Sequence, residues 1–131
     1  MAKKDNKKKN NAKNVPHRDN YARISYLYQL SNHLTSTHPI LARGITRNMD
    51  LVGKKTVSKS SPNLKRTICK QCHSILIPGL NMTMYIENLS KEKRAINDVL
   101  VWKCDCGKCK RFPVGKGENI VFPDRDGVRI D

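Results

Sequence analysis

Five cysteines stand in two groups along this 131-residue chain, and the cysteine thiolate is a preferred ligand of soft metal ions. Cys69 and Cys72 are separated by two residues, and Cys104, Cys106 and Cys109 follow after 31 intervening residues. Tetrahedral Zn²⁺ is commonly held by four thiolates, and a tight turn with Cys-x-x-Cys spacing presents two of them. The pattern predicts one structural zinc ion held between two cysteine turns.

The second group contains one thiol more than a tetrahedral site needs. Cys106 is favoured as a ligand because Gly107 follows it, and glycine permits the tight backbone of a metal knuckle. Cys109 has the standard two-residue spacing from Cys106, whereas Cys104 forms a shorter Cys-x-Cys chelate. Spacing alone favours Cys109 as the fourth ligand. His73 directly follows a ligand, so we interpret it as a surface or supporting residue.

A catalytic zinc site is the less favoured interpretation of these cysteines. Such a site needs an open coordination position and a neighbouring base, whereas this chain offers enough thiols to close the metal's shell. Asp98 and Asp105 near the second group are interpreted as turn or solubilising residues, and the sequence positions no nucleophile pair. We therefore expect no catalytic residue and no enzyme activity of the chain by itself.

Basic residues surround the cysteines. The chain has 26 Lys and Arg against 11 Asp and Glu, a net charge of +15, which predicts a polyanionic partner and nucleic acid first. Seventeen of these cations against six acids lie between residues 14 and 113, so the charge is not confined to the N-terminus. The predicted phosphate contacts are Lys65, Arg66, Lys70, Lys108, Lys110 and Arg111.

Composition limits the fold to one small domain. Only 37% of the residues are apolar, so we expect a modest core that needs a bound ion for support. No apolar run approaches the ~20 residues of a membrane-spanning helix, and no signal-peptide core is recognised. We expect an intracellular protein without membrane association, in which a reducing environment favours metal binding over disulfides.

Two helices are expected to precede the cysteines. Apolar side chains at helical spacing between residues 21 and 34 predict a first helix, which Asp19 or Asn20 caps and which ends before Pro39. A second stripe at helical spacing consists of Leu41, Ile45, Met49 and Val52.

Alternating apolar residues predict short strands on either side of a charged connection at residues 88–97. The alternating positions are Met82, Met84 and Ile86, then Val99 and Val101. The predicted fold class is a small α+β domain. Its predicted parts are a disordered basic arm (1–16), an antiparallel helical hairpin (17–55), a linker (56–63), a zinc ribbon of short antiparallel strands (64–113) and a C-terminal tail (114–131).

Two runs of sequence match a known family. The runs are RTICKQCHSILIPGLN and WKCDCGKCKRFP, preceded by YLYQLSNHL and LARGITRNMDLVGKKT. Over roughly residues 17–113 the chain resembles the zinc-ribbon protein subunit of eukaryotic and archaeal ribonuclease P. Some yeast-like members have Cys-x-Cys-Gly at the second knuckle, which corresponds to Cys104 and Cys106 here. The resemblance therefore implies that Cys69, Cys72, Cys104 and Cys106 bind the metal, with Cys109 spare.

The resemblance also implies a function. It indicates an accessory protein of a nuclear ribonucleoprotein whose RNA removes the 5′ leader from precursor tRNA, so the protein would not be the catalyst. The implied partners are ribonuclease P RNA, precursor tRNA and other protein subunits, including a small basic barrel-like subunit. Two alternatives stay open: a subunit of the related ribonuclease MRP, and a DNA-binding or transcription-associated zinc ribbon.

Overall fold

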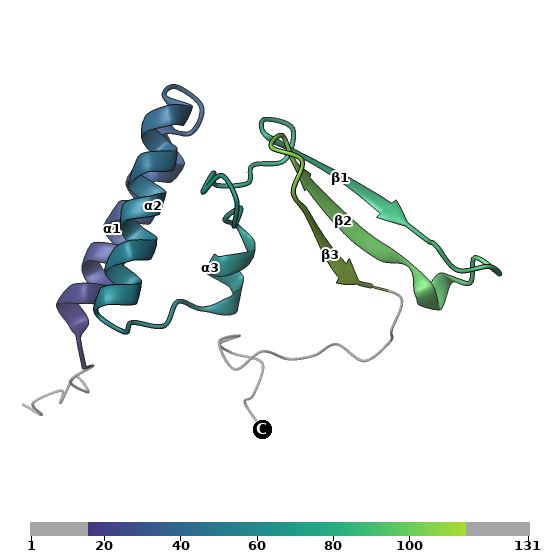
Figure 1. Ribbon diagram of the computed structural model, residues 1–131, viewed down its shortest axis with the longest axis horizontal. Coiled ribbons are helices and arrows are strands. Elements are labelled where there is room, and N and C mark those ends of the chain that lie inside the picture. Colours follow the sequence, from purple (N-terminus) through teal and green to yellow (C-terminus); the bar gives the residue numbers. More distant parts are fainter. Residues whose placement is uncertain (1–15, 115–131) are drawn as a thin grey trace, which may run out of the picture.

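The computed structural model describes residues 16–114, so the predicted arm up to residue 15 and the predicted tail from residue 115 lie outside the described residues. The elements are α1 (Arg18–Leu34), α2 (Pro39–Lys55), α3 (Pro62–Arg66), β1 (Met82–Glu87), a 3-10 turn (Ala95–Asn97), β2 (Val99–Cys104) and β3 (Cys109–Pro113). A small α+β domain of helices followed by short antiparallel strands was predicted, and this fold class is confirmed: the strands form one three-stranded antiparallel sheet (Figure 1). Within the described residues, no helix is long and apolar enough to cross a membrane.

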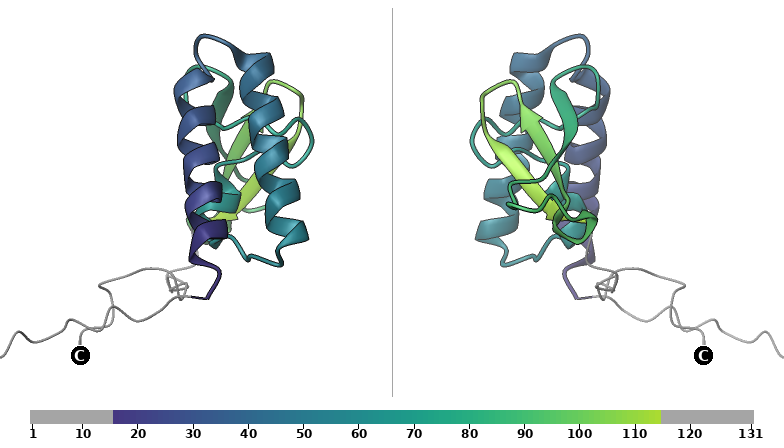
Figure 2. Two further views of the ribbon diagram at one scale, coloured as in Figure 1. Left: turned by 90° about the vertical axis from the view of Figure 1, so that its left-hand side faces the viewer. Right: turned by 90° about the vertical axis from the view of Figure 1, so that its right-hand side faces the viewer.

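The helices α1 and α2 lie side by side as a hairpin (Figure 2). The predicted start of α1 was wrong: the N-cap is His17, in a left-handed conformation with φ of 59°, and no side chain caps the helix. The helix ends at Leu34, and Pro39 is the first residue of α2. Proline suits that position because its missing N–H would be unpaired there in any case.

The hairpin of α1 and α2 buries a pair of small polar residues beside its apolar ones. Ser31 and Thr46 are fully buried, their hydroxyl oxygens lie 2.5 Å apart, and both lie within 3.0 Å of the Ala42 carbonyl oxygen. One hydroxyl therefore donates to the carbonyl and the other to its neighbour, which leaves neither unpaired. The predicted stripe on α2 was wrong at Leu41, which is 55% exposed, because Ala42 takes the inward position.

Replacing Thr46 with valine tests this buried pair. Thr46→Val keeps the shape but removes one hydroxyl, so Ser31 retains only the Ala42 carbonyl as a partner. We expect the free energy of unfolding to fall by about 1 kcal/mol in urea denaturation. Ser25→Ala on the exposed face of α1 should change it by less than about 0.5 kcal/mol. Equal effects of the two substitutions would show that the buried pair adds nothing.

The sheet has the order β1-β2-β3, with Met84 opposite Trp102 and Trp102 opposite Lys110. Its well-packed end is the end near the cysteines, where Val101 is fully buried and Met82 is 2% exposed. The predicted burial of the β1 alternation was wrong further along, because Met84 and Ile86 are exposed where the sheet extends away from the helices (Figure 1). We call the two cysteine turns and the sheet, residues 67–113, the ribbon.

A short helix joins the hairpin to the ribbon. α3 begins inside the stretch predicted as a linker: Ser61 is its N-cap and accepts a hydrogen bond from the Leu64 N–H at 3.2 Å, and Pro62 follows it. Tyr28 in α1 shares a hydrogen bond of 3.0 Å with Thr67. Arg43 in α2 donates one of 2.9 Å to Ser74, which lies after the first pair of cysteines. These bonds fix the hairpin against the start of the ribbon.

Candidate metal centre and nucleic-acid interface

Two tight turns present the cysteines. In the second turn Gly107 has φ of 91°, and its N–H donates to the Cys104 carbonyl at 2.9 Å, as the glycine in the sequence predicted. In the first turn the corresponding left-handed residue is His73, with φ of 57° and an N–H bond of 3.1 Å to the Cys69 carbonyl. The sequence indicated no such conformation, since histidine adopts it far less readily than glycine.

Four thiols converge between these turns. The Sγ atoms of Cys69, Cys72, Cys104 and Cys106 all lie within 4.8 Å of one another. The Cys69 to Cys106 distance is 3.5 Å and the Cys72 to Cys104 distance is 3.6 Å. With Zn–S bonds of about 2.3 Å, the edge of a ZnS₄ tetrahedron is about 3.8 Å, so these spacings fit such a site. This group of four can hold a metal ion, and Cys109 is not a member of it.

The environments of the thiols differ before a metal binds. Burial raises the pKa of Cys104 to about 12 and also raises the pKa of Cys69. Burial acts in the same direction on Cys72, but hydrogen bonds with the hydroxyl and backbone of Ser74 and with the thiols of Cys69 and Cys104 together outweigh it and lower its pKa to about 7. A metal must displace the protons from these thiols, so its affinity should fall as the pH falls.

Lys110 lies beside the metal group, but its ammonium is engaged by the fold. Nζ donates to the carbonyl oxygens of Lys65, Arg66 and Ile68 at 3.0, 2.6 and 2.5 Å. Lys65 and Arg66 are the last two residues of α3, where a helix leaves carbonyl groups without partners inside the helix, and Ile68 lies two residues further on. Burial lowers the pKa of Lys110. Its predicted contact with phosphate is therefore secondary to a bridge that ties β3 to α3.

Lys110→Met tests how much this bridge contributes to the free energy of unfolding. The substitution keeps the length of the side chain but leaves three carbonyls without their shared donor, which should lower the free energy of unfolding by about 1–3 kcal/mol. Lys108→Met removes the same charge at an exposed position and is the matched control. Thermal denaturation of the metal-loaded protein is the measurement, and indistinguishable midpoints for the two variants would rule the bridge out.

The other predicted RNA-contact residues divide into two kinds. Lys65, Lys70 and Lys108 are exposed. Arg66 lies 5.9 Å from the centre of the Phe112 ring and also bonds Asn63, and Arg111 pairs with Glu87 at 3.3 Å. The three lysines are therefore the more available to a ligand.

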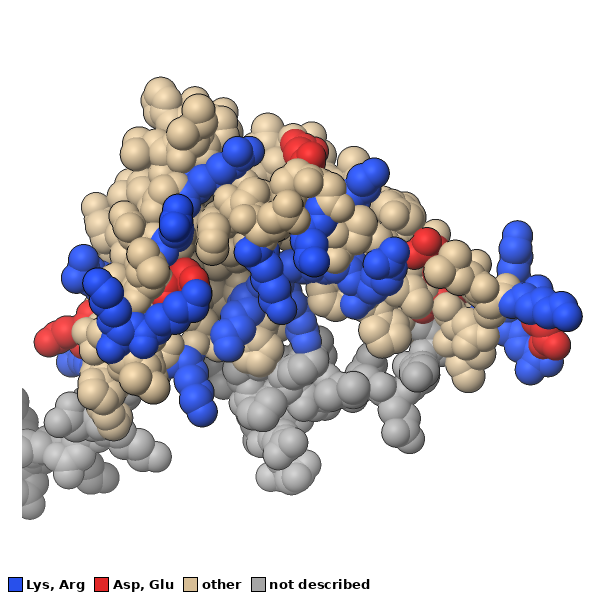
Figure 3. Space-filling view, in the orientation of Figure 1, with Lys and Arg blue, Asp and Glu red and all other residues tan. Residues whose placement is uncertain are grey.

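Basic side chains gather in the hollow between the hairpin and the ribbon (Figure 3). Lys54 and Lys59, which the sequence analysis did not select, line this hollow together with Lys65 and Lys70. No pattern in the sequence marks these two lysines as part of the basic surface, because their position in the fold places them there. Lys54 and Lys59 lie before the cysteines in the sequence, and only the fold brings them beside Lys65 and Lys70.

Comparison with known proteins decides the family. Residues 23–110 match the RNAse P Rpr2/Rpp21/SNM1 subunit domain. The chain belongs to this family. Ribonuclease P protein subunit rpr2 of Schizosaccharomyces pombe is 40% identical over 98 residues, covering 72% of this chain and 91% of that protein. The Saccharomyces cerevisiae subunit RPR2 is 32% identical over 122 residues, covering 86% and 78%. The resemblance drawn from the two sequence runs is thus confirmed.

Solved structures of similar proteins support the Rpr2/Rpp21 fold. The structure of Pfu Rpp21 matches with a TM-score of 0.55 and 30% identity, covering 71% of this chain and 97% of that one. A chain from an archaeal ribonuclease P structure with mature tRNA matches with a TM-score of 0.63, covering 78% and 82%, and its 22% identity supports the fold alone. The family region begins inside α1 and ends at the start of β3, so it contains most of the hairpin, both cysteine turns and the four converging cysteines.

Proposed function

We propose that this protein is a non-catalytic, RNA-binding subunit of ribonuclease P that supports removal of the 5′ leader from precursor tRNA. The observation that carries the proposal is the family match over residues 23–110, together with the similarity to proteins named as ribonuclease P subunits. The proposed partners are ribonuclease P RNA, precursor tRNA and other subunits of the particle, including a small basic barrel-like protein. The proposed location is the nucleus, as the yeast relatives suggest.

The proposed metal is one structural zinc ion, with Cys69, Cys72, Cys104 and Cys106 as its ligands. Their four sulfurs fit a tetrahedron and leave no open coordination position for a substrate. When bound, zinc supplies a crosslink between the two turns rather than a Lewis acid for chemistry. The thiolates hold it from opposite sides, and the backbone hydrogen bonds of His73 and Gly107 keep the turns in shape.

Paired substitutions distinguish the two candidates for the fourth ligand. Cys104→Ser should lower the bound zinc well below one ion per chain, because Cys104 is buried within the group of four. Cys109→Ser should leave one ion per chain, because the Cys109 sulfur lies apart from that group, 3.7 Å from the Gly107 carbonyl. Elemental analysis of protein purified without chelators is the measurement. The opposite pattern would show that spacing alone had been the better guide.

The proposed RNA contacts are Lys65, Arg66, Lys70, Lys108, Lys110 and Arg111. Support comes from a rigid scaffold that holds them near the metal centre and from the net charge of +15. Lysine and arginine neutralise phosphates without reading base identity, so the binding should be distributed and largely independent of sequence. Lys65, Lys70 and Lys108 are exposed, which supports these three more strongly than the other three.

Depletion of the protein from cells tests the proposed function. We expect precursor tRNAs that retain their 5′ leaders to accumulate, and the wild-type gene to restore processing. The purified protein alone, supplied with Mg²⁺ and precursor tRNA, should cleave nothing, because the proposal assigns catalysis to the RNA. Normal 5′ ends after complete depletion would contradict a role in leader removal, and cleavage by the protein alone would contradict the accessory role.

Ribonuclease MRP is the second candidate particle. The sequence resemblance extends to the zinc subunit of this related particle, and the cysteine pattern does not separate the two. The two yeast relatives are both named as ribonuclease P subunits, which favours ribonuclease P. A DNA-binding or transcription-associated ribbon is disfavoured because the match includes the helical hairpin as well as the ribbon.

A further inference from the structure

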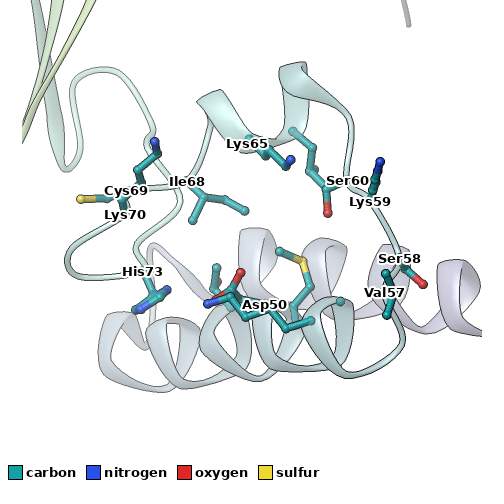
Figure 4. Close-up of a pocket in the computed structure, with 15 residues that line it drawn as sticks. Asp50, Val57, Ser58, Lys59, Ser60, Lys65, Ile68, Cys69, Lys70 and His73 are labelled. Atoms are coloured by element: carbon teal, nitrogen blue, oxygen red, sulfur yellow. The ribbon is translucent and has the colours of Figure 1, made fainter.

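A groove of about 690 Å³ lies between α2 and the segment that runs from Val57 to His73 (Figure 4). We call it the α2–α3 groove. Its volume lies within the range of about 300–1,000 Å³ that is usual for small-ligand sites in proteins. The Cys69 sulfur points away from the groove, so this site is distinct from the metal centre although the two share one segment of chain (Figure 4).

The inner surface of the α2–α3 groove is apolar. Met49 is 5% exposed, Leu64 and Ile68 are half-buried, and Ile68 projects into the space between the two helices (Figure 4). His73 stands at one end of the groove and is the one aromatic ring among its lining residues. A flat apolar ligand can therefore be desolvated against aliphatic side chains and can stack on an imidazole.

The rim of the groove is cationic. Lys54, Lys59, Lys65 and Lys70 come from α2, the loop after it, α3 and the first cysteine turn. Asp50 is the one acidic residue that lines the groove, and it already pairs with Lys54 at 2.6 Å. Lys59, Lys65 and Lys70 are exposed. An anionic ligand would therefore meet several positive charges that lie around an apolar centre.

We propose that the α2–α3 groove takes one unpaired nucleotide of the bound RNA. The base lies against Leu64 and Ile68 and stacks on His73, and the neighbouring phosphates contact the rim lysines. The inference rests on the proposed RNA-binding function. It adds a site for a base to the phosphate contacts proposed above. Single-stranded RNA combines a flat apolar base with evenly repeated charges, and proteins commonly recognise it by stacking.

An acidic peptide is the competing occupant, and the groove favours it less. The rim lysines are spread over four segments around the groove, which matches charges repeated along a backbone. The aromatic ring at one end suits a base more than an aliphatic side chain. The groove is also continuous with the proposed RNA contacts, because Lys65 and Lys70 belong to both.

Fluorescence of a base analogue tests the nucleotide site. The full-length, zinc-loaded protein is titrated with a short unstructured RNA that carries one fluorescent adenine analogue, and with the corresponding duplex. The wild type should change the analogue's fluorescence and should bind the single strand. His73→Asn removes the ring, while asparagine tolerates the left-handed backbone. It should abolish the fluorescence change and weaken single-strand binding about tenfold, with little effect on the duplex.

Matched variants separate the groove from general charge. Lys59→Gln should reduce the slope of log affinity against log salt for single-stranded RNA by about 0.7. Lys55→Gln and His33→Asn change exposed residues on the hairpin that do not line the groove, and both should behave as the wild type. Ser60→Leu narrows the groove without altering charge or the cysteine turn. It should therefore abolish the fluorescence change and weaken single-strand binding as His73→Asn does, and it keeps the test valid if His73→Asn folds poorly.

The remaining outcomes of these titrations distinguish failure of the groove proposal from failure of the proposed function. If the wild type binds RNA but the His73, Lys59 and Ser60 variants match their controls, the groove proposal is overturned and the proposed function stands. If the wild type binds neither RNA, the proposed function itself fails. If the analogue's fluorescence never changes, and an acidic apolar peptide binds the wild type but not Lys59→Gln, the groove takes a protein segment and the nucleotide proposal is wrong.

Discussion

Removal of zinc is expected to unfold the ribbon while the helical hairpin keeps most of its structure. The ribbon's buried cluster consists of Cys69, Leu76, Met82 and Cys104, so half of its members are proposed metal ligands. A structural zinc ion contributes on the order of 10 kcal/mol, which a core of this size cannot replace. The hairpin has its own buried contacts through Ser31 and Thr46, which do not involve the metal.

The chain reports this expected result through its single tryptophan. Trp102 packs against the ribbon's buried cluster, and its ring meets the Phe112 ring edge-on with 4.8 Å between the ring centres. Its fluorescence should therefore shift to longer wavelength when a chelator removes the metal. Far-ultraviolet circular dichroism should retain most of the helical signal. Cys72→Ser should reproduce the chelated spectrum without chelator, and Cys109→Ser should match the wild type. A tryptophan spectrum unchanged by complete zinc removal would show that the ribbon folds without the metal.

RNA affinity is expected to fall steeply as salt concentration rises, and three exposed lysines of α3 and the cysteine turns should account for much of the slope. Each neutralised phosphate releases counterions, which contributes roughly −0.7 to −0.9 to the slope of log affinity against log salt. The combined replacement of Lys65, Lys70 and Lys108 by glutamine should therefore flatten the slope by about 2 for structured RNA. Lys110 is left intact because its loss would weaken the fold as well as the charge.

A matched triple variant controls for charge alone. Lys55, Lys91 and Lys93 are exposed and lie outside the proposed contact set, so their replacement by glutamine lowers the net charge by the same amount. This control should lose less than one unit of slope, and both variants should keep one zinc ion per chain. Equal flattening by the two triple variants would show that net charge, and not the face beside the metal, determines RNA binding.

Features with local chemical signatures were predictable from the sequence. Cysteine spacing and Gly107 marked both turns, and helical spacing marked the hairpin. The spacing argument pointed to Cys109, whereas the resemblance pointed to Cys104, and the structure places Cys104 within the group of four thiols. The count of intervening residues does not determine which sulfur faces the first turn, so spacing alone could not decide between the two cysteines.

Features that depend on packing were not predictable. The buried Ser31 and Thr46 carry no apolar signal, so the inward face of α2 was placed on Leu41 instead of Ala42. The bridge from Lys110 to three carbonyls requires β3 to lie beside α3, which no local pattern reveals. The left-handed conformation of His73 is imposed by its turn rather than by the preference of histidine.

The RNA that co-purifies with the tagged protein from cells tests the central proposal most directly. The protein is isolated at low salt concentration, because the binding is expected to be electrostatic, and the bound RNAs are sequenced. We expect strong enrichment of ribonuclease P RNA over total RNA, and loss of that enrichment in Cys72→Ser. Enrichment of ribonuclease MRP RNA alone, or of neither RNA, would contradict the assignment to ribonuclease P.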